Sequence, residues 1–387
     1  MINANEFDVL VIGGGIAGTG IAAHLAPSRK VAVLEMEEQP GFHSTGRSAA
    51  LFVIGYGNHV VRALTLASRK FFYAPDEGFC DGPLVNRREI MIVGRAEKRD
   101  AFEQYIASEL PADNLKQISA AAALELCPVL RSEGLIGAVL DVDAADIEVH
   151  ALQQGYIKRL KSHGGQIFLN SKVEEVAFDQ VTQRWKLKTS QGVFRASVLV
   201  NAAGAWADEI AAKVGAKTIG IEPRRRTAAL IDVPEGLNSK DWPMILDADE
   251  QFYMKPDAGL LLISPADETP SKPEDAQPDE LDVAIAADRL QQVTSIEVRR
   301  IKNKWAGLRS FVADRSPVVG FDPEIPGLFW LAALGGYGIQ TAPALSALAA
   351  KLVLKLPVHN ELQAMKISEA DLSPTRLFLP VSESIRE

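Results

Sequence analysis

The feature that most constrains this chain is a glycine-rich turn close to the N-terminus. Residues 7–12 have the continuous apolar pattern of a buried strand, residues 16–26 the alanine-rich pattern of a helix, and residues 31–35 the pattern of a second strand. A G-x-G-x-x-G motif lies between the first strand and the helix, at Gly13, Gly15 and Gly18. A β-α-β unit with this turn is typical of dinucleotide binding, with the pyrophosphate at the positive N-terminus of the helix.

Each residue type of the motif has a physical task. The first glycine permits the tight turn, the second lets a pyrophosphate approach the backbone, and the third allows the helix to pack closely on the strand. Glu35, at the end of the second strand, is placed to accept hydrogen bonds from the adenosine ribose. The motif alone leaves NAD and FAD open. The sequence has no second G-x-G-x-x-G and no C-x-x-C, which favours electrons that come directly from a bound substrate.

Length and charge exclude several classes of protein. A chain of 387 residues predicts about two domains at roughly 150 residues each. The formal net charge of −9 opposes binding to nucleic acids and to anionic lipid surfaces. Cys80 and Cys127 are too few for a disulfide scaffold and lack the paired spacing of a zinc site, so we expect no metal.

Two uncharged runs, 9–28 and 325–350, are long enough to cross a bilayer. Glycines interrupt both runs, and Pro343 interrupts the second, so we interpret each as a buried strand–turn–helix unit and expect no transmembrane segment. Residues 1–6 have no basic stretch followed by an apolar segment, which predicts a cytoplasmic protein.

The rest of the chain alternates between two patterns. A helix is predicted from about Glu148 to Gly164, then strands at 166–169, 173–178, 185–189 and 193–201, and from Leu328 a buried strand, a glycine turn and a helix through about Leu354. Short alternating strands are predicted between these blocks, at 89–93, 227–233, 251–254 and 259–264. The four prolines of residues 265–281 predict a surface excursion.

Five further segments, together with the N-terminal motif, carry a resemblance to a known family. These are residues 41–50, 200–206, 252–259, 305–311 and 335–341. They are similar to the D-amino-acid oxidase/glycine oxidase (DAO) superfamily of FAD-dependent enzymes, and within it to the bacterial D-arginine dehydrogenases. The resemblance implies an α/β fold in which a Rossmann-like FAD-binding domain (1–75, 145–215 and 310–387) is interleaved with an α+β substrate domain (76–144 and 216–309) on an antiparallel or mixed sheet.

The resemblance also implies the residues that bind FAD. Val173 holds the adenine by its backbone, and Gly335, Gly336 and Gly338 open a helix whose N–H groups stabilise negative charge on the flavin. His43 is either a flavin neighbour or a polar turn residue. Because no cysteine lies near this glycine turn, we expect the FAD to be non-covalent. The full predicted set is Gly13, Gly15, Ile16, Ala17, Gly18, Glu35, Ser44, Thr45, Arg47, Ser48, Ala49, Val173, Ala203, Gly204, Trp206, Gly335, Gly338, Ile339, Gln340 and Thr341.

The substrate of this family is anchored by its carboxylate. The matching positions are Arg225 or its neighbour Arg226, of which we select Arg225, together with Arg309 and Tyr253. Arginine suits the task because its planar fork donates two parallel hydrogen bonds to a carboxylate. Tyr56 corresponds to a tyrosine on a mobile loop, with Gly55 and Gly57 as hinges. Gly336 and Gln340 complete the predicted catalytic set.

The side-chain pocket differs from that of the D-arginine dehydrogenases. Leu51, Val53 and Ile90 stand where those enzymes have a histidine, a threonine and a glutamate. Glu89 does not replace that glutamate, because a shift of one residue along a strand turns a side chain to the opposite face. We therefore expect neutral or apolar substrates, since a cationic side chain would be poorly solvated here.

The predicted activity is the FAD-dependent oxidative deamination of D-amino acids, with hydride transfer from Cα to flavin N5. An oxygen or quinone-type acceptor would then take the electrons. Three alternatives stay open: oxidation of an N-substituted amino acid of the sarcosine or opine type, oxidation of a 2-hydroxy acid, and an FAD-binding subunit without turnover.

Overall fold

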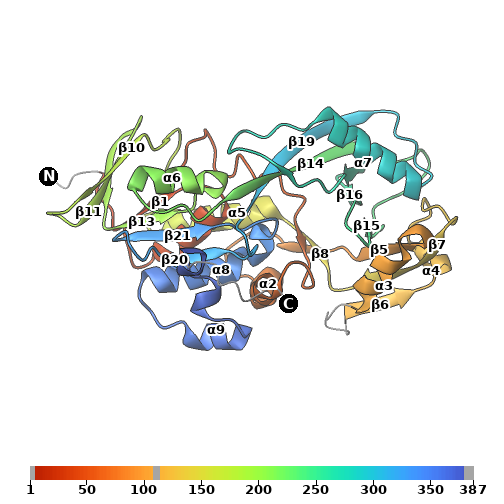
Figure 1. Cartoon of the computed structure of the whole chain (residues 1–387), viewed down its shortest axis with the longest axis horizontal. Helices are drawn as coiled ribbons and strands as arrows, with labels where there is room; N and C mark the ends of the chain where they lie inside the picture. Colours follow the sequence, from red (N-terminus) through yellow and green to blue (C-terminus); the bar gives the residue numbers. More distant parts are fainter. Residues whose placement is uncertain (1–4, 108–113, 379–387) are drawn as a thin grey trace.

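The computed structural model describes residues 5–107 and 114–378, which form two joined parts (Figure 1). Residues 1–4 and 379–387 of the predicted FAD domain, and 108–113 of the predicted substrate domain, lie outside the described residues. The expectation of a cytoplasmic location rests on residues 1–6, and residues 1–4 also lie outside the described part of the chain.

The first part is built on a six-stranded sheet in which five strands are parallel and β20 is antiparallel to β21. The strands, in spatial order, are β20 (Val318–Phe321), β21 (Leu328–Ala332), β13 (Val198–Asn201), β1 (Val9–Ile12), β2 (Val31–Leu34) and β9 (Gln166–Phe168). Gly13 and the glycines after β21 therefore leave the same carboxyl edge of the sheet, where ligands bind in open α/β folds.

Both faces of this sheet are covered, as its continuous apolar strands predict. Val9 and Val11 of β1 face a core shared with helices, and Leu10 and Ile12 face a second core. The first core contains residues of α1 (Ile16–Leu25), α2 (His59–Tyr73), α5 (Val149–Ser162) and α8 (Gly338–Val353). The second core contains residues of β11 (Arg184–Thr189), β12 (Gly192–Ala196) and α6 (Ala207–Val214), and β10 (Glu175–Asp179) pairs with β11.

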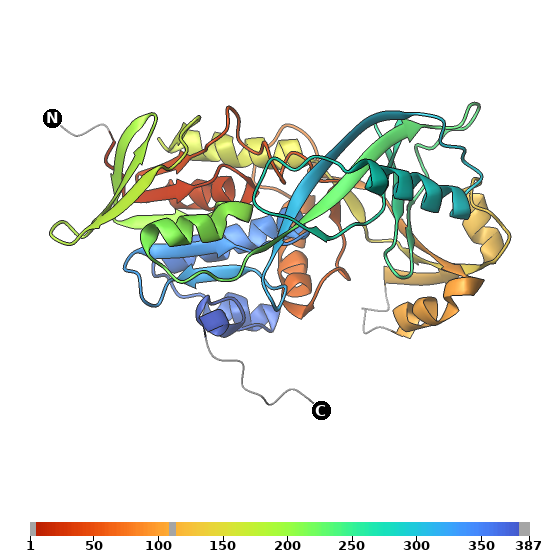
Figure 2. The ribbon, with the colours of Figure 1, turned by 45° about the horizontal axis from the view of Figure 1, so that its top comes forward.

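The second part is a nine-stranded mixed sheet. Its strands are β18 (Thr269–Pro270), β14 (Glu222–Asp232), β17 (Leu260–Ser264), β16 (Tyr253–Asp257), β15 (Met244–Asp247), β5 (Ile90–Arg95), β7 (Leu135–Asp141) and β6 (Leu115–Ile118), with β19 (Ile301–Phe311) paired to β14. The long strands β14 and β19 run from this sheet toward the first part (Figure 2). Its helices are α3 (Arg99–Ala107), α4 (Ala120–Leu126) and α7 (Glu280–Val293).

The two faces of the second sheet have different surroundings. Met91 and Val93 of β5 pack in a core with α4 and α7, whereas Ile90 and Ile92 belong to a smaller cluster with Leu51. A three-stranded sheet of β3 (Leu51–Phe52), β8 (Ala145–Ile147) and β4 (Val85–Arg87) lies where the chain passes between the two parts. The remaining helices within the described residues are η1 (Ala96–Lys98), η3 (Gly204–Trp206), α9 (His359–Met365), η4 (Glu369–Asp371) and α10 (Thr375–Phe378).

Two expectations about elements are wrong. Residues 193–201 form two strands, because β12 pairs antiparallel with β11 whereas β13 joins β1 in the central sheet. Residues 265–281 are more than a surface excursion: β18 pairs with β14, Ala276 is buried, and α7 begins at Glu280. The two uncharged runs are strand–turn–helix units, as predicted, and no helix in the described part of the chain could span a membrane.

Candidate active site

A cavity extends from the β1–α1 turn, past the turn between β21 and α8, to the inner face of the second sheet. Most of the predicted site residues line it. Gly18, Thr341 and Arg225 do not, and each of these exceptions has a structural reason given below. The lining residues from the predicted set are Gly13, Gly15, Ile16, Ala17, Glu35, Ser44, Thr45, Arg47, Ser48, Ala49, Leu51, Val53, Tyr56, Ile90, Val173, Ala203, Gly204, Trp206, Tyr253, Arg309, Gly335, Gly336, Gly338, Ile339 and Gln340.

The β1–α1 turn is shaped by its glycines. Gly13 has φ of +106°, and a Cβ there would lie 2.4 Å from the carbonyl oxygen of Ala202 at the end of β13. A Cβ on Gly18 would lie 1.9 Å from the Gly13 carbonyl oxygen, so Gly18 serves helix–strand packing and does not reach the cavity. The turn can therefore present backbone N–H groups to a phosphate at close range.

Glu35 is held by the backbone of the turn. Its Oε2 accepts a hydrogen bond from the Gly14 N–H at 2.7 Å, and its Oε1 accepts one from the Glu37 N–H at 2.9 Å. Its carboxylate borders the cavity although only 7% of the residue is exposed. A fixed acid at this place suits the hydroxyl groups of a ribose.

The segment around Thr45 packs over the turn. Thr45 Oγ1 accepts a hydrogen bond from the Ile16 N–H at 3.0 Å, and Ser44 Oγ donates to the Leu308 carbonyl. Arg47 also lines the cavity, and its guanidinium is paired within the protein. It donates to the carbonyls of Ala276 and Ala306 and to Asp275, which fastens β19 and residues 275–276 to this segment.

His43 lines the cavity. Its Nε2 is 2.8 Å from Glu37 Oε1, and its ring centroid is 4.7 Å from that of Trp206. His43 therefore has a hydrogen-bond partner and an aromatic neighbour at the cavity wall.

The turn between β21 and α8 forms the other wall. The Gly335 N–H donates to the Ser310 carbonyl at 2.9 Å, which places β19 against this turn. A Cβ on Gly336 would lie 1.9 Å from Arg309 Nη2, so only glycine allows the guanidinium to lie across the turn. The Thr341 hydroxyl donates a hydrogen bond to the Tyr337 carbonyl and so stabilises the first turn of α8. Thr341 is fully buried in the protein and does not line the cavity.

Gln340 presents an unpaired donor at this wall. Its Oε1 accepts a hydrogen bond from the Val53 N–H at 3.0 Å, whereas its buried Nε2 has no partner within the described residues. A buried amide nitrogen without a partner is costly unless a ligand accepts its hydrogen bond. The two glycine turns and the unpaired Nε2 of Gln340 together fit a bound flavin, whose polar ring edge would accept a hydrogen bond from this nitrogen.

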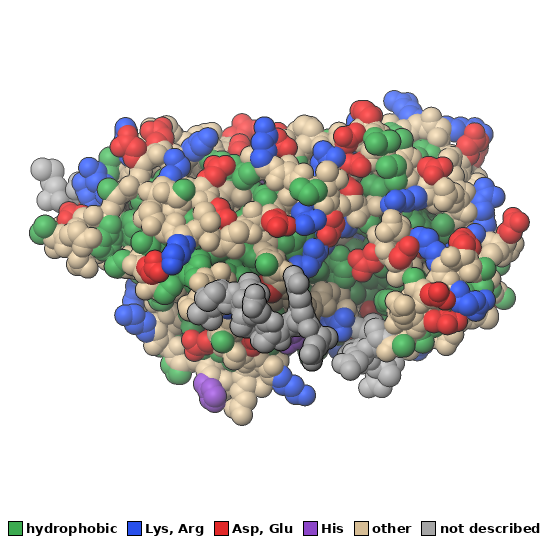
Figure 3. All heavy atoms as spheres, in the orientation of Figure 1, with side chains coloured by type: hydrophobic (Ala, Val, Ile, Leu, Met, Phe, Trp, Pro, Cys, Tyr) green, Lys and Arg blue, Asp and Glu red, His purple; other side chains and the backbone are tan. Residues whose placement is uncertain are grey.

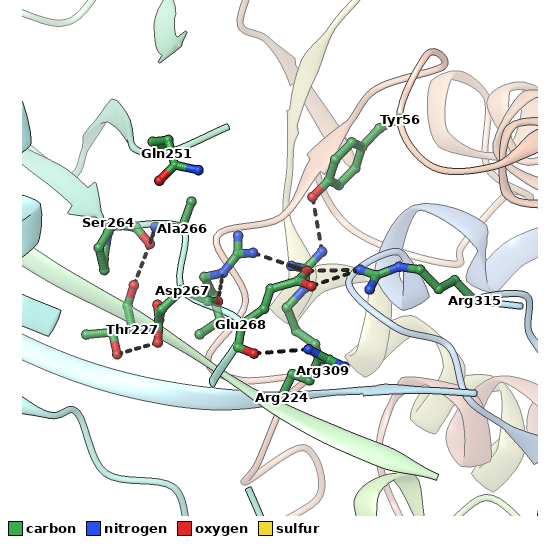
Figure 4. Close-up of polar contacts among 12 residues, drawn as sticks. Tyr56, Arg224, Thr227, Gln251, Ser264, Ala266, Asp267, Glu268, Arg309 and Arg315 are labelled. Atoms are coloured by element: carbon green, nitrogen blue, oxygen red, sulfur yellow. Dashed lines mark hydrogen bonds and ion pairs between the residues drawn. The ribbon is translucent and has the colours of Figure 1, made fainter. Parts of the chain in front are cut away.

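Arg309, the predicted anchor of the substrate carboxylate, lies on β19. Its Nη2 donates to the Tyr56 hydroxyl at 3.0 Å and its Nη1 to Glu268 Oε1 at 2.8 Å (Figure 4). Burial opposes its charge, but Tyr56 and Glu268 outweigh that effect and hold the pKa of Arg309 above its ordinary value. Tyr253, on β16, lines the same cavity.

Arg225 is not brought together with Arg309. It donates to Asp282 of α7 at 2.8 Å, and Asp279 and Asp267 lie within 3.9 Å. Its neighbour Arg226 lines the cavity instead, because successive side chains of β14 point to opposite faces. The selection of Arg225 over Arg226 is therefore corrected by the geometry of the strand.

The sequence reasoning missed several cavity residues, among them three titratable side chains near Ile90. Beyond Leu51, Val53 and Ile90 the wall includes Tyr105, Asp141 and Glu250. Burial raises the pKa of Asp141 and of Glu250. Burial, together with the negative charge of Asp141, also raises the pKa of Tyr105 to about 12. Asp141 is paired with Ile90 across β5 and β7, a neighbour that only the strand register reveals.

The parallel sheet, the glycine turn at its carboxyl edge and the arginine facing the cavity define the class of a dinucleotide-binding oxidoreductase. The family model described as "FAD dependent oxidoreductase" (DAO) matches residues 8–352, and the chain belongs to this family. FAD is its cofactor.

Known proteins agree with this assignment. The chain is 26% identical to the glycine oxidase of Geobacillus kaustophilus over 90% of this chain and 93% of that protein. The crystal structure of that enzyme covers 96% of this chain and 99% of its own, with a TM-score of 0.81 and 22% identity. Two further solved structures are similar to this chain. L-α-Glycerophosphate oxidase from Mycoplasma pneumoniae with FAD bound has a TM-score of 0.81 and 18% identity, over 90% of this chain and 95% of its own. Iminodiacetate oxidase from Chelativorans has a TM-score of 0.75 and 20% identity, over 90% of this chain and 96% of its own.

Proposed function

We propose that this protein oxidises the C–N bond of a small amine-bearing carboxylate, most simply a D-amino acid with a neutral or apolar side chain. The observation that carries the proposal is the buried Arg309, which faces the cavity beside Tyr56 and is seated on Gly336. When bound, FAD supplies a two-electron acceptor for the hydride that leaves the substrate Cα. The imino acid that results is hydrolysed by water to a 2-oxo acid and ammonia.

The chain contributes positioning and charge. Arg309 and Arg226 would bind the carboxylate, and Tyr56 and Tyr253 would close the site around it. Leu51, Val53 and Ile90 would hold an apolar side chain and exclude water. The amine must lose a proton before or during hydride transfer. Solvent would accept this proton, so no protein base is required.

The cofactor is proposed to be non-covalent, since neither Cys80 nor Cys127 lines the cavity. We likewise propose that the chain has an FAD-binding domain built on the six-stranded sheet and a substrate domain built on the nine-stranded sheet. Oxygen or a quinone would reoxidise the cofactor, and measurement of hydrogen peroxide beside an artificial acceptor separates the two.

A second candidate is an N-substituted amino acid. The structural similarity to iminodiacetate oxidase favours it, because a secondary amine with a carboxylate would use the same anchor. The test is anaerobic addition of D-alanine, D-leucine, D-phenylalanine, D-arginine, sarcosine, iminodiacetate and L-2-hydroxyglutarate to the purified yellow protein. We expect D-leucine or D-phenylalanine to bleach the flavin absorbance fastest.

Other outcomes of this panel have definite meanings. Fastest bleaching by D-arginine would contradict the apolar pocket and would point to Asp141 and Glu250 as partners of a cationic group. Bleaching by sarcosine or iminodiacetate alone would select the second candidate. No bleaching by any compound, while FAD stays bound, would favour an FAD-binding subunit without turnover.

A further inference from the structure

A carboxylate of the protein itself lies at the substrate anchor. Glu268 Oε1 is 2.8 Å from Arg309 Nη1, 3.0 Å from Arg315 Nη2 and 3.6 Å from Arg226 Nη2 (Figure 4). Three arginines therefore converge on one oxygen. Two of them, Arg226 and Arg309, are the cavity residues assigned above to the substrate carboxylate.

Both terminal nitrogens of the Arg309 guanidinium already donate a hydrogen bond in this arrangement. Glu268 accepts from Nη1 and the Tyr56 hydroxyl accepts from Nη2. A substrate carboxylate that forms two parallel hydrogen bonds with this end needs both nitrogens. Each of these nitrogens carries two hydrogens, so Glu268 and such a substrate compete for the charge of the guanidinium and for the space around Nη1.

Arg315 offers Glu268 a second partner. Its Nη2 lies 3.0 Å from Oε1 and 3.1 Å from Oε2, so this contact involves both carboxylate oxygens. The Arg315 guanidinium carbon is 3.8 Å from the centroid of the Phe311 ring, which fixes its position at the end of β19. Glu268 can therefore release Arg309 without losing its ionic partner.

Glu268 is partly exposed and remains charged. Its side chain is 30% exposed, and its main-chain carbonyl accepts a hydrogen bond from Arg224 Nη1 at 3.4 Å. Burial opposes ionisation, but the hydrogen bond from Arg315 and the charges of the arginines outweigh it and hold the pKa of Glu268 below its ordinary value.

We propose that Glu268 is an internal carboxylate that occupies the Arg309 anchor in the substrate-free enzyme and is displaced onto Arg315 by the carboxylate of the substrate. The inference rests on the proposed function. Glu268 would then determine specificity. It neutralises part of the positive charge of the site, and a ligand needs a carboxylate of its own to take the place of Glu268 beside Arg309.

The test is the binding of propionate, a simple carboxylate without an amine, to the FAD-loaded protein. Binding is followed by perturbation of the flavin absorbance, which needs no turnover. Glu268→Gln keeps the shape and removes the charge, and we expect it to tighten propionate binding about tenfold. Glu274→Gln is the matched control, because Glu274 lies in the same segment but pairs with Ser271 and Lys272.

A double-mutant cycle supplies the second measurement. Arg315→Met removes the alternative partner and should weaken propionate binding, and this weakening should disappear when Glu268→Gln is also present. The FAD content and melting temperature of each variant show whether it is folded.

Equal or weaker binding by Glu268→Gln would overturn the inference, since the anchor would then be used without displacement or would depend on Glu268 for its position. Additive effects in the cycle would also overturn it. Propionate binding to neither the original protein nor the Glu268→Gln variant would contradict the carboxylate anchor itself, and with it the proposed function.

Discussion

Adjacent arginines on one strand have different surroundings and therefore different expected roles. Arg226 borders the cavity and Arg225 faces the acidic side chains of α7 and Asp267. Both residues occur in a run of three arginines that the sequence alone cannot orient, because the register of β14 against β19 decides which face each side chain takes.

We predict that Arg226→Met and Arg225→Met differ in their effect on KM. Arg226→Met should raise the KM for a carboxylate substrate roughly tenfold, and it should also lower stability because its hydrogen bond to the Asp267 carbonyl is lost. Arg225→Met should leave KM unchanged and lower the free energy of unfolding by about 1–3 kcal/mol, because Asp282 and Asp267 lose a partner. Steady-state kinetics and urea unfolding check both, and a raised KM for Arg225→Met would restore the original selection.

Single residues were predictable where a motif fixed their surroundings. Gly13, Gly336 and Arg309 belong to continuous segments that carry the family resemblance, and the structure places all three at the cavity. Glu268 and Asp141 were not predictable, because their importance depends on contacts with residues that are distant in the sequence.

At the scale of elements, the packing of α1 against α5 places a histidine in an apolar environment. His24 lies at the end of α1, and its ring centroid is 6.1 Å from that of Tyr156 on α5. Burial and the charge of Arg159 lower the pKa of His24 to about 4, partly offset by Asp76. His24 is therefore neutral in the folded protein under conditions in which an unfolded chain would protonate it.

This packing predicts a pH dependence of stability. The contribution of neutral His24 is fully present above about pH 6.5, its unfolded pKa, and is lost as the pH falls toward about 4, because the unfolded state then binds more protons. Between about pH 7 and pH 5 the original protein should lose roughly 2 kcal/mol more stability than His24→Gln. Urea unfolding at both pH values tests this, and parallel losses would contradict it.

Elements with local contacts were the predictable ones. The β1–α1–β2 unit and the β21–α8 unit follow from continuous apolar patterns and glycine turns. The pairing of β14 with β19 was not predictable, since the strands are about 80 residues apart and only the folded chain brings Arg224 opposite Arg309. Residues 265–281 contact the site because β18 pairs with β14 and because Glu268 and Ala276 accept hydrogen bonds from Arg309 and Arg47.

At the scale of the whole molecule, the site is assembled from both parts. Most of the predicted cofactor residues come from the six-stranded sheet and the segments that follow its strands. The predicted substrate residues come from the second sheet, together with Leu51 of β3 and the nearby Val53 and Tyr56. The overall acidic charge of −9 contrasts with the three arginines that converge at the anchor. A small anion is thus attracted at one place, although the net charge opposes the binding of polyanions. On the face drawn in Figure 3, Lys and Arg side chains are interspersed with Asp and Glu side chains.

The central claim is that a buried arginine anchor selects amine-bearing carboxylates for oxidation by the bound FAD. The most direct measurement compares anaerobic flavin bleaching by D-leucine, D-leucinamide and isoamylamine, which share the side chain and the amine but differ at the carboxylate. The account predicts rapid bleaching by D-leucine and at least about 100-fold slower bleaching by the other two. Equal rates for all three compounds, or bleaching by the amine alone, would contradict it.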